Sequence, residues 1–209
     1  CGSAGLANAI SKAGNNIEQK NDKNIPNLPK FIVSGSATQL TLKQIGKLKE
    51  EKKEIVFIDL EIKDIIKESN EELINKINEN LSQNKDVLIH SSYINKEILD
   101  ENDLNQLIDA GIAKDEFSNK ITDFLSNLVK EINSTNDFIL ITIGGETSYK
   151  CANAIESGYL DVLDAILPAV PLCKDKNNKY IITKSGNFGQ TNTLVEIIDY
   201  FNRIQNENI

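Results

Sequence analysis

Residues that could build a metal site or a redox pair are scarce in this 209-residue chain. It has one histidine, three cysteines and no methionine or tryptophan. The cysteines Cys1, Cys151 and Cys173 are scattered, and none forms a CxxC motif or a group with His90. A structural zinc site is therefore not expected, and we identify no metal-ligand set. Scattered thiols in odd number fit a reducing compartment, so we expect a cytoplasmic protein.

A single histidine also limits the catalytic chemistry. His90 stands at the end of a predicted strand, where a satisfied structural histidine is commoner than a catalytic base. A Ser-His-Asp triad would depend on this residue, and the GxSxG elbow is missing. Cys151 lies in a predicted helix and is interpreted as buried packing. We therefore assign no catalytic residue.

Positive charge is in short supply. The formal net charge is −8, and Arg203 is the single arginine. A nucleic-acid-binding face needs clustered Lys and Arg, so no nucleic-acid partner is expected. No apolar run approaches the roughly 20 residues that span a bilayer, and the chain does not start like a signal peptide, so no membrane partner is expected either. Phosphate binding is still permitted, because backbone amides can supply a local positive field.

Two common nucleotide fingerprints are absent: the Walker A motif GxxxxGK[ST] and the dinucleotide motif GxGxxG. Asp59 and Glu61 are the candidates for an acidic residue ending the second strand, but no GxGxxG precedes them, so a Rossmann-type oxidoreductase is disfavoured. The lack of methionine, with Cys1 as the first residue, indicates a piece of something longer.

Short apolar runs alternate with amphipathic segments over most of the chain. Strands are predicted at 31–34, 55–60, 86–91, 138–143 and 180–184, and helices at 39–51, 70–83, 103–110, 115–133, 148–157 and 191–205. Gly111 separates the third helix from the fourth. This alternation predicts an α/β fold, with a mainly parallel sheet and helices on both faces.

The first 30 residues follow a different pattern. Residues 3–13 have one apolar helix face, which includes Leu6 and Ile10. The stretch 15–30 is polar and ends at two prolines, which is typical of a linker. We interpret 1–14 as the end of a preceding substrate-binding domain, 15–30 as the linker and 31–209 as the main domain.

The segment 160–178 departs from the alternation. Pro168 and Pro171 forbid a continuous helix and impose a fixed extended path. Two interpretations stay open. The segment can be a rigid loop that forms a wall for an adenine ring, or a β-turn that packs on the edge of the domain.

One turn pattern appears three times and is the main functional signal. An apolar run stops at small, glycine-containing residues, and a helix follows at once, in residues 31–45, 138–155 and 180–198. Such a turn presents free backbone N–H groups and the positive end of a helix dipole. In α/β proteins the anion bound there is often a phosphate, so three such turns indicate a nucleotide.

Each turn supplies candidate ligand contacts. The first contributes Ser34 and Ser36, and Lys184 beside the third can neutralise a phosphate charge. Glycines let the backbone approach a ligand closely, and hydroxyl and amide side chains can bond it. Glu146 can hold hydrated Mg²⁺ or merely cap a helix. The alternative for every turn is a plain capped strand–helix connection. The remaining candidate contacts are Gly144, Gly145, Glu146, Thr147, Gly186, Asn187 and Gly189.

Taken in order, these motifs resemble the C-terminal nucleotide-binding domain of the four-carbon acid sugar kinase family. That domain has an SGS turn, a GGET or GGDT turn, a proline-flanked segment and KSGNFG. This chain has SGS at 34–36, GGET at 144–147, PAVP at 168–171 and KSGNFG at 184–189. The start of the chain is similar to the tail of the family's substrate-binding domain, so the resemblance covers nearly all of it.

The resemblance implies the nucleotide-binding domain of a two-domain kinase. Such a kinase uses ATP and Mg²⁺ to phosphorylate a threonate, erythronate or 3-oxo-tetronate at its terminal hydroxyl. The turns described above would contact ATP, because phosphoryl transfer rests on positioning and charge stabilisation.

Two departures qualify this implication. The family usually has PGVP where this chain has PAVP, and its N-terminal DDxTGA-type motif is absent here. We therefore expect a nucleotide-binding half that is inactive alone and meets its sugar acid through the missing domain. The alternative is a non-catalytic module that binds a nucleotide or an anion, or that serves as an interaction module.

Overall fold

The computed structural model describes residues 9–10, 25–36, 38–67, 69–91, 99–113 and 115–207. Residues 9–10 of the predicted N-terminal helix are helical, and the rest of that helix and most of the predicted linker lie outside the described residues. No helix in the described ranges is long and apolar enough to cross a membrane.

The described strands form one seven-stranded sheet in the order β2-β3-β1-β4-β7-β6-β5. The first five strands in this order are parallel, and β5 and β6 add an antiparallel hairpin at one edge. The fold class predicted from the sequence is thereby confirmed. The strands are β1 (Lys30–Ser34), β2 (Val56–Asp59), β3 (Val87–His90), β4 (Ile139–Ile143), β5 (Leu160–Leu167), β6 (Val170–Asp175) and β7 (Tyr180–Lys184).

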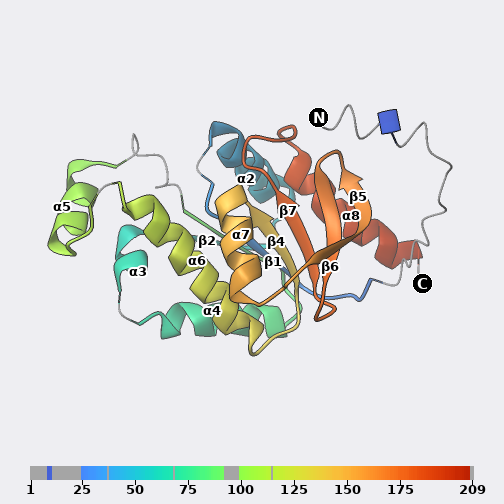
Figure 1. Cartoon of the computed structure of the whole chain (residues 1–209), viewed down its shortest axis with the longest axis horizontal. Helices are drawn as coiled ribbons and strands as arrows, with labels where there is room; N and C mark the ends of the chain where they lie inside the picture. Colours follow the sequence, from blue (N-terminus) through green and yellow to red (C-terminus); the bar gives the residue numbers. More distant parts are fainter. Residues whose placement is uncertain are drawn as a thin grey trace.

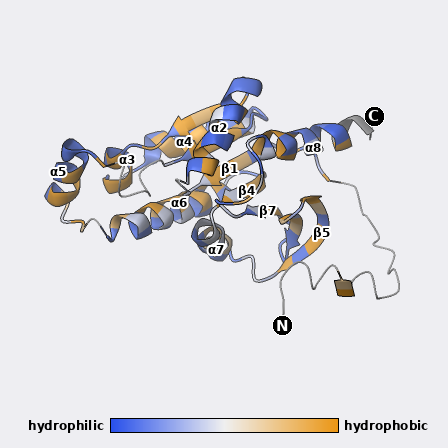
Figure 2. Cartoon of the chain, turned by 90° about the horizontal axis from the view of Figure 1, so that it is seen from above, coloured by the Kyte–Doolittle hydropathy of each residue, from blue (hydrophilic) through white to orange (hydrophobic). Residues whose placement is uncertain are grey.

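Helices cover both faces of the sheet, as predicted. Figures 1 and 2 show α6 and α7 on one side and α2 and α8 on the other. The helices are α2 (Gln39–Glu51), α3 (Ile62–Ile66), α4 (Glu71–Ser82), α5 (Glu101–Asp109), α6 (Phe117–Asn133), α7 (Gly145–Ala154) and α8 (Thr193–Glu207).

Two apolar cores form because the central strands are hydrophobic on both faces, as expected for parallel strands covered by helices. Alternate side chains of β1 illustrate this: Phe31 and Val33 pack toward α4, α6 and α7, whereas Ile32 packs toward α2 and α8. Figure 2 shows the apolar strands between the two helical layers. The cores fix the sheet, and the strand ends are thereby held in register.

The segment around the prolines is a β-hairpin at the edge of the sheet rather than a loop, so the interpretation as a β-turn at the domain edge comes closer. Ala169 has φ = 57°, which turns the chain between β5 and β6. Pro171 is tolerated in β6 because the pairing of β6 with β7 begins at Leu172. The helix α3 was not predicted. The observed α7 begins three residues earlier than predicted and α8 two residues later, because the glycine turns obscure both helix starts.

Candidate functional site

The three glycine turns meet at one edge of the sheet. Ser34, Ile143 and Lys184 end the neighbouring strands β1, β4 and β7, and they are paired across the sheet in this order. The Gly144 N–H donates to the Lys184 carbonyl oxygen at 2.8 Å, which links the second turn to the third. The carboxyl end of a parallel sheet is where α/β proteins bind ligands. The structure therefore brings the three predicted turns together.

The first turn is bonded directly to the third. The hydroxyls of Thr38 and Thr41 donate to the Gly186 carbonyl oxygen at 3.0 and 2.9 Å. A Cβ added to Gly186 would lie 2.1 Å from Ser36 Oγ, so only glycine allows this approach. Ser36 Oγ is itself 3.0 Å from Thr41 Oγ1. Ser34 is fully buried beneath the turn, and its hydroxyl lies 3.5 Å from the Ser36 carbonyl oxygen.

Two residues of α2 complete this junction, and sequence reasoning missed both. Thr41 and Gln44 are buried, and the Gln44 Nε2 group donates to the carbonyl oxygens of Phe188 and Gln190 at 3.1 and 2.8 Å. Their signal was polar side chains on the same helix face as the apolar Ile45. A buried polar group needs a partner, so polar residues on an apolar face point to a nearby backbone.

The second turn leaves a helix N-terminus without a side-chain cap. Gly144 has φ = 112°, and no described side chain bonds the start of α7. The first N–H groups of a helix have no partner within it, so this end can accept an anion. Thr147 is buried, and Ser148 is engaged elsewhere: its hydroxyl donates to the Gly144 carbonyl oxygen at 2.8 Å.

The third turn carries a buried amine. Lys184 is 1% exposed, and its Nζ donates to the Ser185 carbonyl oxygen at 2.8 Å. Burial lowers the pKa of Lys184 to about 8. Asn187 is exposed, and Gly189 has φ = 92°, with the neighbouring Gln190 N–H bonded to Thr193 Oγ1 at 2.8 Å.

Two hollows are lined in part by the β5–β6 turn. One, of about 360 Å³, is lined by residues that include Gly145, Lys184 and Ala169. The other, of about 430 Å³, is lined by residues that include Pro168 and Phe188. The proline segment thus borders the glycine turns, and its role as an adenine wall stays a prediction.

Glu146 is paired with a lysine. Its Oε1 lies 3.7 Å from the Nζ of Lys150, and its side chain is 60% exposed. Within the described ranges no three His, Cys, Asp or Glu side chains are grouped to hold a metal ion. Magnesium needs only one or two protein carboxylates when phosphates supply other ligands, so Glu146 alone is compatible with Mg²⁺ that arrives with a nucleotide.

His90 and Cys151 are the two residues weighed above for a catalytic role. His90 ends β3 next to β1, and its Nε2 lies 2.6 Å from Asp59 Oδ1 at the end of β2. Burial lowers the pKa of His90 although Asp59 raises it, so the ring is neutral near pH 7. Cys151 is buried, which raises its pKa to about 12 and makes it a poor nucleophile.

Comparison with known proteins defines the class of this site. The family model of the nucleotide-binding C-terminal domain matches residues 31–194, which contain all three turns. The protein is thus a nucleotide-binding domain. The chain belongs to this family of nucleotide-binding C-terminal domains. No curated protein matches the chain.

Three solved structures share the fold. Haemophilus influenzae protein HI1011, of the DUF1537 family, has a TM-score of 0.65 and 20% identity over 91% of this chain and 44% of its own. A Salmonella typhimurium LT2 protein has a TM-score of 0.66 and 20% identity over 92% of this chain and 44% of its own. The third is a DUF1537 protein from Bordetella bronchiseptica, a domain-swapped dimer with bound citrate. It has a TM-score of 0.61 and 14% identity over 81% of this chain and 40% of its own. The chain therefore spans less than half the length of these proteins.

Proposed function

We propose that this chain is the ATP-binding half of a four-carbon acid sugar kinase. The observation that carries the proposal is the junction of three glycine turns at the ends of β1, β4 and β7, in a chain of the nucleotide-binding family. The reaction would transfer the γ-phosphoryl group of ATP to the terminal hydroxyl of a threonate-, erythronate- or 3-oxo-tetronate-like acid.

The phosphates would bind at the start of α7. Its backbone amides have no side-chain cap, and Lys184 lines the same hollow as Gly145. Together these groups supply positive charge at fixed positions, which is what a phosphoryl transfer requires. Thr147, Gly186 and the buried hydroxyls of the first turn would keep this arrangement in place. Mg²⁺ would neutralise phosphate charge, with Glu146 as the carboxylate that holds it.

The base would occupy the hollow beside the β5–β6 turn. Pro168 and Phe188 line it, and Phe188 is 42% exposed, so its ring is available to an adenine. Asn187 and Gly189 line the same hollow. Replacement of Phe188 by Ala is expected to weaken ADP binding and leave pyrophosphate binding unchanged, as measured by calorimetric titration.

The sugar acid would bind to an upstream domain of a longer protein. Residues 1–14 would be the end of that domain and 15–30 the linker. We expect this chain to bind nucleotide but not to phosphorylate a sugar acid unaided, and robust kinase activity of the isolated chain would contradict this. The buried free thiols of Cys151 and Cys173 are consistent with a cytoplasmic setting.

The proposal is tested by titrating the chain with ADP and ATP, with and without Mg²⁺, and with NADH as the negative control. Gly145→Ala is the informative variant, because a Cβ there meets no atom within 4 Å but would stand where a phosphate approaches the backbone. Gly46→Ala, in α2, is the matched control with equal space. We expect Gly145→Ala to lose affinity and Gly46→Ala to keep it. Equal affinities, or no binding at millimolar nucleotide, would refute the proposed site.

A further inference from the structure

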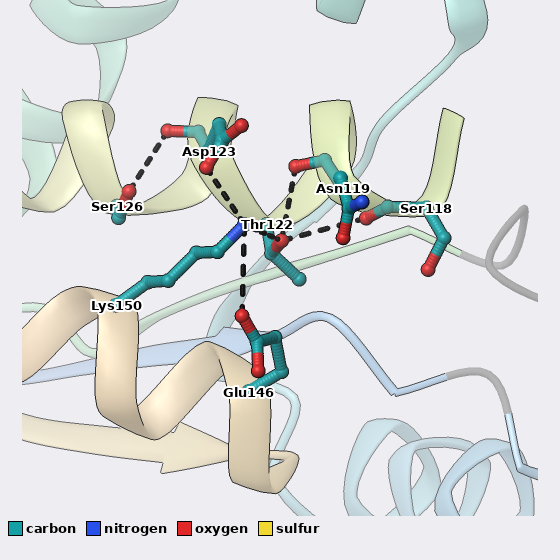
Figure 3. Close-up of polar contacts among 7 residues, drawn as sticks. All are labelled: Ser118, Asn119, Thr122, Asp123, Ser126, Glu146 and Lys150. Atoms are coloured by element: carbon teal, nitrogen blue, oxygen red, sulfur yellow. Dashed lines mark hydrogen bonds and ion pairs between the residues drawn. The ribbon is translucent and has the colours of Figure 1, made fainter. Parts of the chain in front are cut away.

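An ion-pair cluster joins the nucleotide turn to the neighbouring helix. Figure 3 shows the Lys150 side chain of α7 reaching toward α6, with its amine between Asp123 and Glu146. Nζ lies 2.7 Å from Asp123 Oδ1, 3.7 Å from Glu146 Oε1 and 2.8 Å from Thr122 Oγ1. The Lys150 side chain is 21% exposed, so this cation is held mainly by protein groups.

The acceptors around Lys150 are fixed by the backbone of α6. The Thr122 hydroxyl donates to the Asn119 carbonyl oxygen at 3.0 Å, which leaves its lone pairs for the lysine. Asp123 belongs to the next position of the same helix turn, and α6 and α7 pack along each other. The amine is thereby held near Glu146.

Glu146 has a location that opposes phosphate binding. It stands in the first turn of α7, next to the backbone amides that would receive the phosphates, and an anion there repels another. One cation beside this carboxylate reduces the repulsion, while Asp123 competes for the same cation.

We propose that Lys150 is the counter-ion of Glu146 and sets how much the nucleotide site depends on Mg²⁺. With the lysine in place, the turn accepts the phosphates of a nucleotide without metal. Without the lysine, the unpaired Glu146 carboxylate repels the phosphates until Mg²⁺ neutralises both the carboxylate and the phosphates. The inference rests on the proposed function, and Lys150 acts through Glu146 as a positioning and charge-balancing residue.

The test measures ADP binding by calorimetry, with and without Mg²⁺, for four forms of the chain. Lys150→Met is expected to weaken metal-free binding by about fivefold, and saturating Mg²⁺ is expected to restore it. Lys150→Met combined with Glu146→Gln should bind like wild type without metal. Lys130→Met removes the same charge from an exposed part of α6 and should change nothing.

A second variant covers the case in which Lys150→Met does not fold. Asp123→Asn removes the competing carboxylate and leaves the lysine to Glu146, so metal-free affinity should be equal to or higher than that of wild type. Lower affinity for Asp123→Asn overturns the inference. A loss in Lys150→Met that neither Mg²⁺ nor Glu146→Gln restores also overturns it, and so does a metal-free affinity of Lys150→Met equal to that of wild type. Failure of wild type to bind ADP refutes the proposed function itself, whereas normal binding without these differences overturns this inference alone.

Discussion

Nucleotide binding should be coupled to the uptake of a proton by the Lys184 amine. Burial holds the pKa of its amine at about 8 in the free chain. A phosphate in the hollow that Lys184 lines would favour the charged amine and raise this pKa again by about 1–3 units. The sign follows directly: the bound chain holds more protons than the free chain, so affinity must fall as pH rises above about 8.

The size of the effect follows from the two protonation states. At pH 8 about half of the free amines are neutral, so binding should take up about half a proton per site, and at pH 7 only about a tenth. Between pH 7 and 9 the affinity should fall by about five- to tenfold, depending on how far the phosphate raises the pKa of Lys184. The phosphates of the nucleotide are already ionised above pH 7.5, so they contribute little to the uptake.

Calorimetric titration with ADP at pH 8, in buffers of different ionisation enthalpy, measures this uptake. Lys184→Met should abolish the uptake and flatten the pH dependence of the remaining affinity. Lys176→Met, in the exposed turn between β6 and β7, is the matched control and should behave like wild type. An uptake that persists in Lys184→Met, or a wild-type affinity that is constant from pH 7 to 9, would refute the reasoning.

Two further predictions concern stability. Gly186→Ala should lower the melting temperature, because its methyl group would overlap the Ser36 hydroxyl. Gly46→Ala has free space in a helix and should raise the free energy of unfolding by about 0.5–1 kcal/mol. Equal melting temperatures for the two variants would contradict the packing described. Since burial lowers the pKa of His90 from 6.5, the unfolded chain takes the proton first, and the stability that the neutral ring contributes should be lost as pH falls below 6.5. Urea denaturation between pH 7.5 and 5 should therefore show a shallower pH dependence for His90→Gln, and identical slopes would argue against a buried neutral ring beside Asp59.

Much of the fold was predictable because its signals are local. The parallel strands are continuous apolar runs, and each helix has a regular apolar face, so the layers and the three turns could be predicted. The paired ends of β1, β4 and β7 bring the three predicted turns together. Ligand contacts at Ser36, Gly144 and the other candidates remain predictions.

The features that escaped prediction depend on distant contacts. The hairpin β5–β6 was missed because its prolines suggest a break, while their tolerance depends on where β7 stops pairing. The roles of Thr41 and Gln44 depend on carbonyl groups about 145 residues further along the chain. The Lys150 cluster likewise forms because α6 lies beside α7, and no local sequence pattern predicts that the two helices are neighbours.

The distance in sequence between the turns has a consequence for how the protein is made. The hydroxyl of Thr41 hydrogen-bonds a carbonyl group 145 residues downstream, and the Gln44 side chain hydrogen-bonds one 146 residues downstream. Since a ribosome releases the chain from its N-terminus onward, these polar groups emerge long before their partners exist. A nascent chain that ends before β7 therefore has its first two turns but no junction. Closure of the site is one of the last events in the synthesis of this domain, and a bound nucleotide would report that the final strand has been inserted.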